Sequence, residues 1–96
     1  MELTFSGEVI HWRGPAPFLF VPVPDAEAAA LRDPSPLVSY GWGCIPATVR
    51  VGRTTFTTSI FPKDGGYLVP VKVAVQRAER VGLGDVVQVA LLVDGV

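Results

Sequence analysis

Residues 58–72 constrain the fold of this chain more than any other segment. Their sequence, TSIFPKDGGYLVPVK, places a charged, glycine-rich turn between two runs of apolar and β-branched residues. An Asp-Gly pair between such runs is typical of a tight hairpin turn. Pro70 suits the first turn of a helix, where its missing N–H costs nothing. The segment therefore predicts a strand, a tight turn, a second strand and the start of a helix.

The rest of the chain reads as short strands with one further helix. Alternation of apolar and polar residues over 2–12 predicts a half-buried strand. Asp25 is expected to cap a short helix, and Gly82 to end a second one. Strands are expected at 2–12, 18–23, 41–51, 54–61, 67–69 and 85–93, and helices at 26–32 and 70–81. This pattern predicts a mainly β fold: a single domain, residues 1–96, folded as a small six-stranded closed or partly open β-barrel with one or two short helices.

Length and cysteine content favour a single-domain protein of a reducing compartment. The 96 residues suffice for one buried core, and no apolar run reaches the roughly 18 residues of a membrane span. Residues 1–5 include an acidic residue and show no apolar region of a secretory signal. Cys44 is the one cysteine, which excludes an internal disulfide; with a single histidine in the chain, it argues against a metal site. We therefore expect a cytoplasmic protein with no cofactor and no membrane contact.

Basic residues are concentrated in the second half of the chain. Residues 50–80 contain six lysines and arginines and two acidic residues, whereas the remainder contains two basic and seven acidic residues. The net charge of −1 argues against nucleic-acid binding, but this asymmetry can mark a surface that faces an anion. The alternative is that these side chains only keep the exposed strands and helix solvated.

The segment that defines the hairpin also carries a candidate anion site. Gly65 and Gly66 permit positive φ, so successive backbone N–H groups can point into one concavity. Val69 is a poor helix cap, which leaves N–H donors at the following helix start for an anion or for Asp64. The candidate ligand-binding residues are Ser59, Lys63, Gly65, Gly66 and Lys72. The alternative is that Asp64 and Gly65 only form the hairpin turn, with Asp64 capping the helix from within.

No arrangement of residues identifies a reaction. Cys44 and His11 could meet in the fold as nucleophile and base, but neither has a local signature of activation. The carboxylates are scattered, with no pair on one element suited to acid–base catalysis. No catalytic residue is assigned, and a non-enzymatic role is favoured. The aromatic residues that could line a pocket in the barrel mouth, or simply fill the core, are Trp12, Phe18, Phe20, Trp42, Phe56 and Tyr67.

Three segments carry a resemblance to a known family. Trp42-Gly43, residues 58–72 and the sequence GDVV at 84–87 resemble the bacterial family called domain of unknown function 1905. The resemblance spans nearly the whole chain. It implies a compact β-barrel domain with no established activity and no catalytic residues. Cys44 and Phe56 depart from the family pattern, which often has a basic residue and a tryptophan at these positions.

A second similarity covers about a third of the chain. The order strand, proline, helix, Gly-Asp and strand over 67–89 is similar to AbrB-like swapped-hairpin DNA-binding domains. This similarity implies a homodimer that contacts DNA backbone through basic residues, here Arg50, Arg53, Arg77 and Arg80. The function that the sequence favours is a binding module for a small anionic ligand or a protein partner at the 59–72 surface. A nucleic-acid-binding dimer is the alternative.

Overall fold

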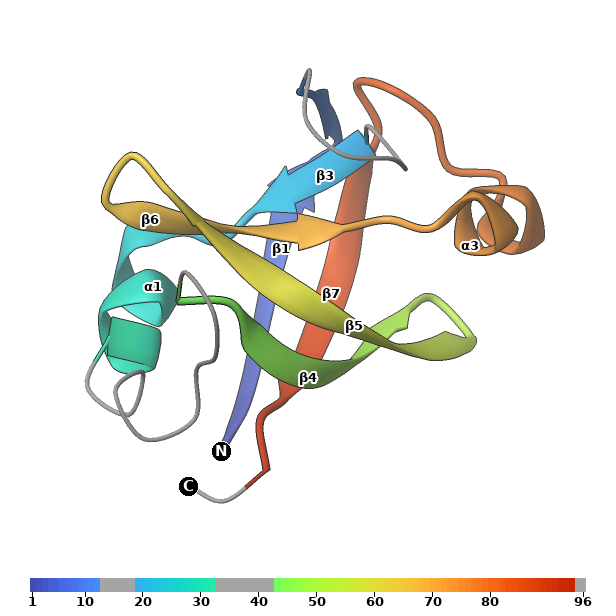
Figure 1. Ribbon diagram of the computed structural model, residues 1–96. Coiled ribbons are helices and arrows are strands. Elements are labelled where there is room, and N and C mark those ends of the chain that lie inside the picture. Colours follow the sequence, from blue (N-terminus) through green and yellow to red (C-terminus); the bar gives the residue numbers. More distant parts are fainter. Residues whose placement is uncertain (13–18, 33–42, 95–96) are drawn as a thin grey trace.

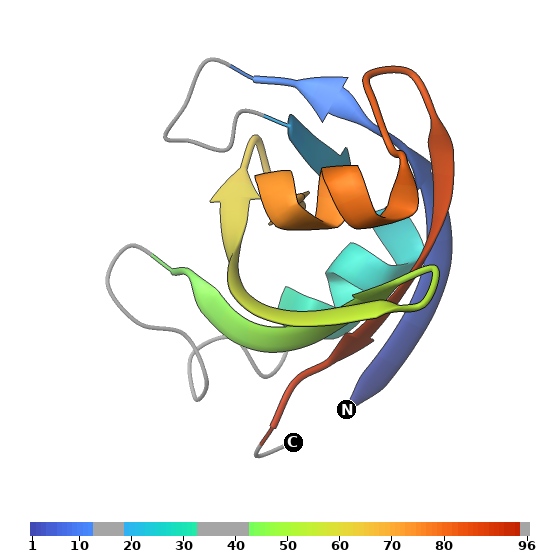
Figure 2. The same cartoon turned by 90° about the vertical axis from the view of Figure 1, so that its right-hand side faces the viewer.

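One antiparallel sheet, curved into an open half-barrel, forms most of the molecule (Figure 1). The structure is a computed structural model that describes residues 1–12, 19–32 and 43–94. The elements are β1 (Glu2–Glu8), β2 (Ile10–His11), β3 (Leu19–Pro22), α1 (Asp25–Arg32), β4 (Ile45–Val51), β5 (Thr54–Lys63), β6 (Gly66–Pro70), α3 (Val73–Glu79) and β7 (Val86–Leu92). The two helices lie on opposite sides of the half-barrel, and Figure 2 looks onto α3 with α1 behind it.

The strand order β1-β7-β4-β5-β6-β3-β2 places the first two strands at opposite ends of the sheet. Only Val9 separates β1 from β2, so this part of the chain runs as one bent segment between the two ends. The Val9 N–H donates to the carbonyl oxygen of Asp85 at 2.8 Å, and the Val9 carbonyl accepts from the N–H of Gly84 at 2.9 Å. The expected single strand at 2–12 is therefore divided in two. The described part of the chain forms a partly open barrel of seven strands rather than six.

Gly7 lies where β1 passes close to β3. A Cβ atom at this position would stand 2.6 Å from Cγ1 of Val21 and 3.2 Å from the carbonyl oxygen of Pro22. The first distance is shorter than real carbon–carbon contacts, so only a residue without a side chain allows the two strands to come this close. Gly7 thus permits the approach that draws the two ends of the sheet together.

The core fills the concave side of the sheet. In β4, alternate residues from Ile45 to Val51 are buried, and those between them are exposed or half-buried. Helix α1 adds Ala28 and Leu31 to the same core. Each fully buried valine or leucine contributes about 1.5–3 kcal/mol relative to an exposed one. The buried residues that pack together are Phe5, Val9, Val21, Val23, Ala28, Leu31, Ile45, Ala47, Val49, Val51, Ile60, Tyr67, Val69, Val71, Val75, Val89, Leu91 and Val93.

The chain after the β5–β6 hairpin differs from the expected helix start. Pro70 is the last residue of β6 and lies opposite Phe20 of β3. Val71 donates the next bond to β3, to the carbonyl oxygen of Leu19 at 2.9 Å. Neighbouring residues of a strand point their N–H groups to opposite sides, so the missing N–H of Pro70 breaks no bond of this ladder. The expectation that Pro70 begins the helix is therefore wrong.

Helix α3 is shorter than expected. Lys72 occupies the N-cap position without a side-chain capping bond, and Arg80 forms the C-cap in the left-handed conformation, with φ of 53°. Gly82, expected to end the helix, instead donates its N–H to Oδ2 of Asp85 at 2.8 Å. The helix stops at Glu79 because Arg80 leaves the helical conformation, so the expectation for Gly82 is wrong.

The start of α1 is shifted by one residue from the expected cap. The carbonyl of Pro24 accepts the first helical bond, from the N–H of Ala28 at 2.8 Å, which places Pro24 at the N-cap. Asp25 lies in the first turn instead. A carboxylate there is stabilising because it faces the positive end of the helix dipole.

Candidate functional site

The tip of the β5–β6 hairpin is a two-residue turn. Asp64 and Gly65 have φ of 50° and 80°, and Lys63 pairs with Gly66 across the turn. Positive φ at both central residues is the signature of the type I′ turn, whose twist matches that of the flanking strands. The turn predicted from the Asp-Gly pair is confirmed. Its geometry accounts for Gly65 without any ligand.

Arg32, the last residue of α1, joins that helix to the hairpin turn. Its Nε and Nη2 atoms donate to the carbonyl oxygen of Gly65 at 3.2 and 2.7 Å. Sequence reasoning missed this residue because nothing local connects positions 33 apart in the chain. The one available signal was its place in the last turn of a predicted helix, where a basic side chain complements the helix dipole.

Lys63 lies between a carboxylate and an aromatic ring. Its Nζ atom is 3.3 Å from Oδ2 of Asp64 and 4.9 Å from the centre of the Trp12 ring. Trp12 contacts Phe20 edge to face, with ring centres 5.4 Å apart, and Phe20 contacts Phe61 in the same way at 6.2 Å. The ammonium group is thus held near the hairpin by an ion pair and a cation–π contact.

The other aromatic residues that the sequence suggested for a pocket lie at different places in the fold. Tyr67 is buried in the core, and Phe56 lies 5.9 Å from the Nζ atom of Lys72. Phe18 and Trp42 lie outside the described residues.

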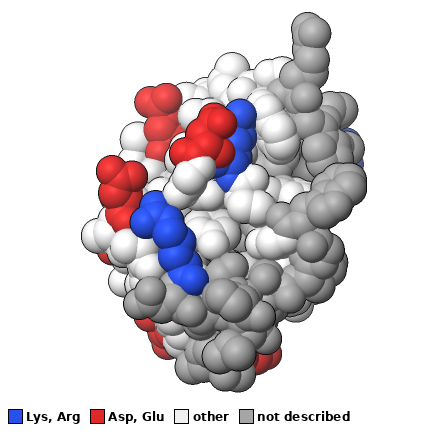
Figure 3. Space-filling model, turned by 60° about the vertical axis from the view of Figure 1, so that its left-hand side comes forward, with Lys and Arg blue, Asp and Glu red and all other residues white. Residues whose placement is uncertain are grey.

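A shallow depression of about 360 Å³ lies at the hairpin tip. Its lining residues are Arg32, Pro62, Lys63, Asp64, Gly65, Gly66 and Tyr67. Figure 3 brings forward the left-hand side of Figure 1, where α1 and the hairpin tip lie. Basic and acidic side chains stand next to one another on this face, without an extended patch of either sign among the residues drawn.

Two of the predicted ligand residues do not line this depression. Lys72 follows the far end of β6. At about 3.3 Å per residue, it lies roughly 20 Å along the chain from the hairpin tip. Ser59 is half-buried in β5, opposite Pro46 of β4. The structure therefore brings Lys63, Gly65 and Gly66 together with Arg32, and leaves Ser59 and Lys72 apart from them.

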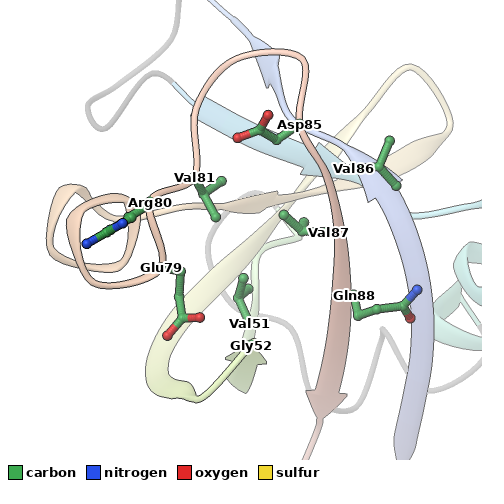
Figure 4. Close-up of a pocket in the computed structure, with 9 residues that line it drawn as sticks. All are labelled: Val51, Gly52, Glu79, Arg80, Val81, Asp85, Val86, Val87 and Gln88. Carbon is green, nitrogen blue, oxygen red and sulfur yellow. The ribbon is translucent and has the colours of Figure 1, made fainter.

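A second concave surface lies beside α3, on the opposite side of the molecule (Figures 1 and 4). It measures about 410 Å³ and is lined by Val51, Gly52, Glu79, Arg80, Val81, Asp85, Val86, Val87 and Gln88. Glu79 accepts a bond from Oγ1 of Thr54 at 2.6 Å and packs against Gly52. These contacts hold the end of α3 against the β4–β5 turn. Sequence reasoning named one residue of this groove, Arg80, as a candidate contact residue, and named Asp85, Val86 and Val87 only as part of the GDVV segment that carries the family resemblance.

One family model matches nearly the whole chain, including the residues that line the hairpin depression and the groove beside α3. The family model described as Domain of unknown function (DUF1905) matches residues 5–91. The chain belongs to this family. The resemblance of three sequence segments to the DUF1905 family is therefore confirmed. The matched range includes the β5–β6 hairpin and both helices. A search of curated proteins gives no significant match.

The DUF1905 domain exposes all four arginines named for nucleic-acid contact. They are Arg50 on β4, Arg53 in the β4–β5 turn, Arg77 on α3 and Arg80 at its C-cap. Because Glu79 contacts Gly52 and Thr54, the end of α3 and the turn are neighbours, and each carries an exposed arginine. Arg50 lies apart, beside Glu2 in a depression of about 180 Å³ on the outer face of the sheet.

Within the described ranges, this DUF1905 domain has no group of three or more histidine, cysteine, aspartate or glutamate residues that could hold a metal ion. His11 is exposed on β2, and Cys44 is half-buried immediately before β4. Among the helices described, none is long and apolar enough to cross a membrane.

Proposed function

We propose that this DUF1905 domain is a binding module that takes a small anionic ligand in the depression at the β5–β6 hairpin. One observation carries the proposal: two basic side chains from different elements, Arg32 of α1 and Lys63 of β5, line the same concave surface. Among the described residues of that lining, Asp64 is the one acidic residue, and its side chain is 87% exposed. The balance of charge in the depression therefore favours an anion.

The two basic groups differ in what they offer the ligand. The Arg32 guanidinium has five N–H donors in a planar fork and uses Nε and Nη2 on Gly65, which also sets its orientation. Lys63 supplies a point charge whose position is set by Trp12 and Asp64. A phosphate or carboxylate that displaces Asp64 from Lys63 would meet both groups. Because the site is open to solvent, its affinity should fall as salt is added.

Thermal unfolding in inorganic phosphate tests this proposal, with chloride at equal ionic strength as the reference. We expect phosphate to raise the Tm of the parent protein and of Lys72→Gln, which loses the same charge at the far end of β6. The rise should be absent in Lys63→Gln. Equal rises in the parent and in Lys63→Gln would overturn the proposal.

The alternative function is a nucleic-acid-binding dimer, and the neighbouring positions of the α3 end and the β4–β5 turn favour it. Arg53 and Arg80 sit on these two segments, with Arg77 on the same helix. DNA binding through them would weaken steeply as salt is added, because each neutralised phosphate releases counterions. Absence of binding at low salt would exclude this function, and sedimentation measures whether a dimer forms.

A further inference from the structure

We propose that the groove beside α3 binds an extended peptide segment of another protein as an additional short strand on β7. The partner segment carries an apolar side chain next to a basic one. This surface is separate from the hairpin depression, so the inference stands independently of the anion site.

The first observation is that the first residues of β7 pair with a neighbouring strand on one side and have no paired strand on the other. β1 pairs with β7 as far as Glu8↔Val86, whereas β4 pairs with it only as far as Val51↔Val89. β4 ends at Val51, and the chain then turns into β5, which pairs with β4 and not with β7. The strand edge at residues 86–88 therefore faces the groove instead of a full neighbouring strand.

The direction of the backbone groups at this edge follows from the ladder with β1. Val9 donates to the carbonyl of Asp85, and Val93 donates to that of Met1, so odd-numbered residues of this segment bond toward β1. In an antiparallel ladder, alternate residues point their N–H and C=O groups to the other side. The backbone N–H and C=O of Val86 thus point away from β1, into the groove, where an extended peptide can pair with them.

The second observation is the apolar lining. Val51 is 2% exposed and forms a floor with the half-buried Val81 and Val87. In Figure 4 these three side chains converge, while Val86 and Gln88 project from the other face of β7. The groove therefore follows the strand edge itself. Val86, at 70%, is the most exposed large apolar side chain among the described residues, and it belongs to this edge.

The third observation is charge. The groove lining contains two acidic residues and one basic residue: Glu79 lies by the β4–β5 turn and Asp85 in the loop before β7, whereas the Arg80 side chain points away (Figure 4). Each carboxylate accepts one bond, from Thr54 Oγ1 and from the Gly82 N–H respectively. These bonds fix both groups, and a carboxylate has about four acceptor sites, so each can also receive a cation. The lining is thus complementary to a lysine or arginine beside the apolar anchor.

The test is a titration of the ¹⁵N-labelled full chain with the blocked peptide acetyl-Val-Lys-Val-Lys-Val-amide, followed by amide chemical shifts. Acetyl-Val-Glu-Val-Glu-Val-amide is the matched control. We expect saturable shifts centred on residues 86–88 with the basic peptide, slower hydrogen exchange at the Val86 amide, and no saturation with the acidic peptide. Shifts centred elsewhere, or equal binding of both peptides, would overturn the proposal.

Two variants separate backbone pairing from charge. Val86→Pro removes the N–H that points into the groove and leaves the β1 ladder intact, so affinity should fall about tenfold, the loss that corresponds to one hydrogen bond. The double variant Glu79→Gln, Asp85→Asn keeps one acceptor oxygen on each side chain but removes both charges. It should lower affinity by a similar factor. If Val86→Pro does not fold, the charge variant decides. Unchanged affinity in a folded variant, or a dimer of this chain that closes the edge and excludes the peptide, contradicts the proposal.

Discussion

The guanidinium group of Arg32 binds the carbonyl oxygen of Gly65 through two N–H donors, at 2.7 and 3.2 Å. This contact joins the end of α1 to the tip of the β5–β6 hairpin, which are distant in sequence. It also places a second cation beside Lys63 in the hairpin depression. One side chain thus serves the docking of a helix and the charge of the proposed site.

Replacing Arg32 should loosen this docking. We expect Arg32→Ala to lower the free energy of unfolding by about 1 kcal/mol, the usual net value of a hydrogen bond. Arg50→Ala, at an exposed position on the outer face of β4, is the matched control and should change stability less. Urea denaturation measures both, and equal losses would show that the Gly65 contact does not stabilise the fold.

Gly7 should tolerate no side chain. The Cβ atom of Gly7→Ala would overlap Cγ1 of Val21 on β3, so β1 and β3 must move apart, at a cost of about 1–3 kcal/mol. In Gly82→Ala the new Cβ meets nothing within 4 Å. Thermal unfolding of the two variants should therefore differ clearly. A Gly7→Ala protein as stable as Gly82→Ala would contradict the close approach of β1 to β3 at Gly7.

The bond from Thr54 to Glu79 should hold the end of α3 in place. Thr54→Val keeps the shape of the side chain but removes the donor, so amide hydrogen exchange in α3 should become faster and stability should fall by about 1 kcal/mol. Thr54→Ser retains the hydroxyl group and is the control. Equal exchange rates in α3 for the valine and serine variants would argue against this role.

Glycine should be required at position 65 because of its positive φ, and not because a side chain would clash with neighbouring atoms. A Cβ atom at Gly65 would meet nothing within 4 Å, but φ is 80°, which disfavours a side chain. We expect Gly65→Ala to cost about 1 kcal/mol and Gly66→Ala, at a position without positive φ, to cost less. Denaturant titration of both variants checks the order, and the reverse order would contradict the type I′ turn.

Local patterns in the sequence predict the strands and the hairpin well. The Asp64-Gly65 pair fixes its turn because few residues adopt positive φ, and the alternation in β4 fixes which residues are buried. Pro70 is compatible with a helix start and with a strand end, and its place depends on pairing with Phe20 in a distant strand. The contact of Arg32 with Gly65 depends in the same way on how α1 meets the sheet. Contacts between residues that are distant in sequence leave no signal in the local sequence pattern.

The proposed anion site is tested most directly by titrating ¹⁵N-labelled protein with inorganic phosphate and following both the backbone amides and the Nε–H of Arg32. The account predicts saturable shifts confined to residues 63–67 and to the Arg32 side chain, and their loss in Lys63→Gln. Shifts that fail to saturate, or that are largest around Lys72 and α3, would contradict it.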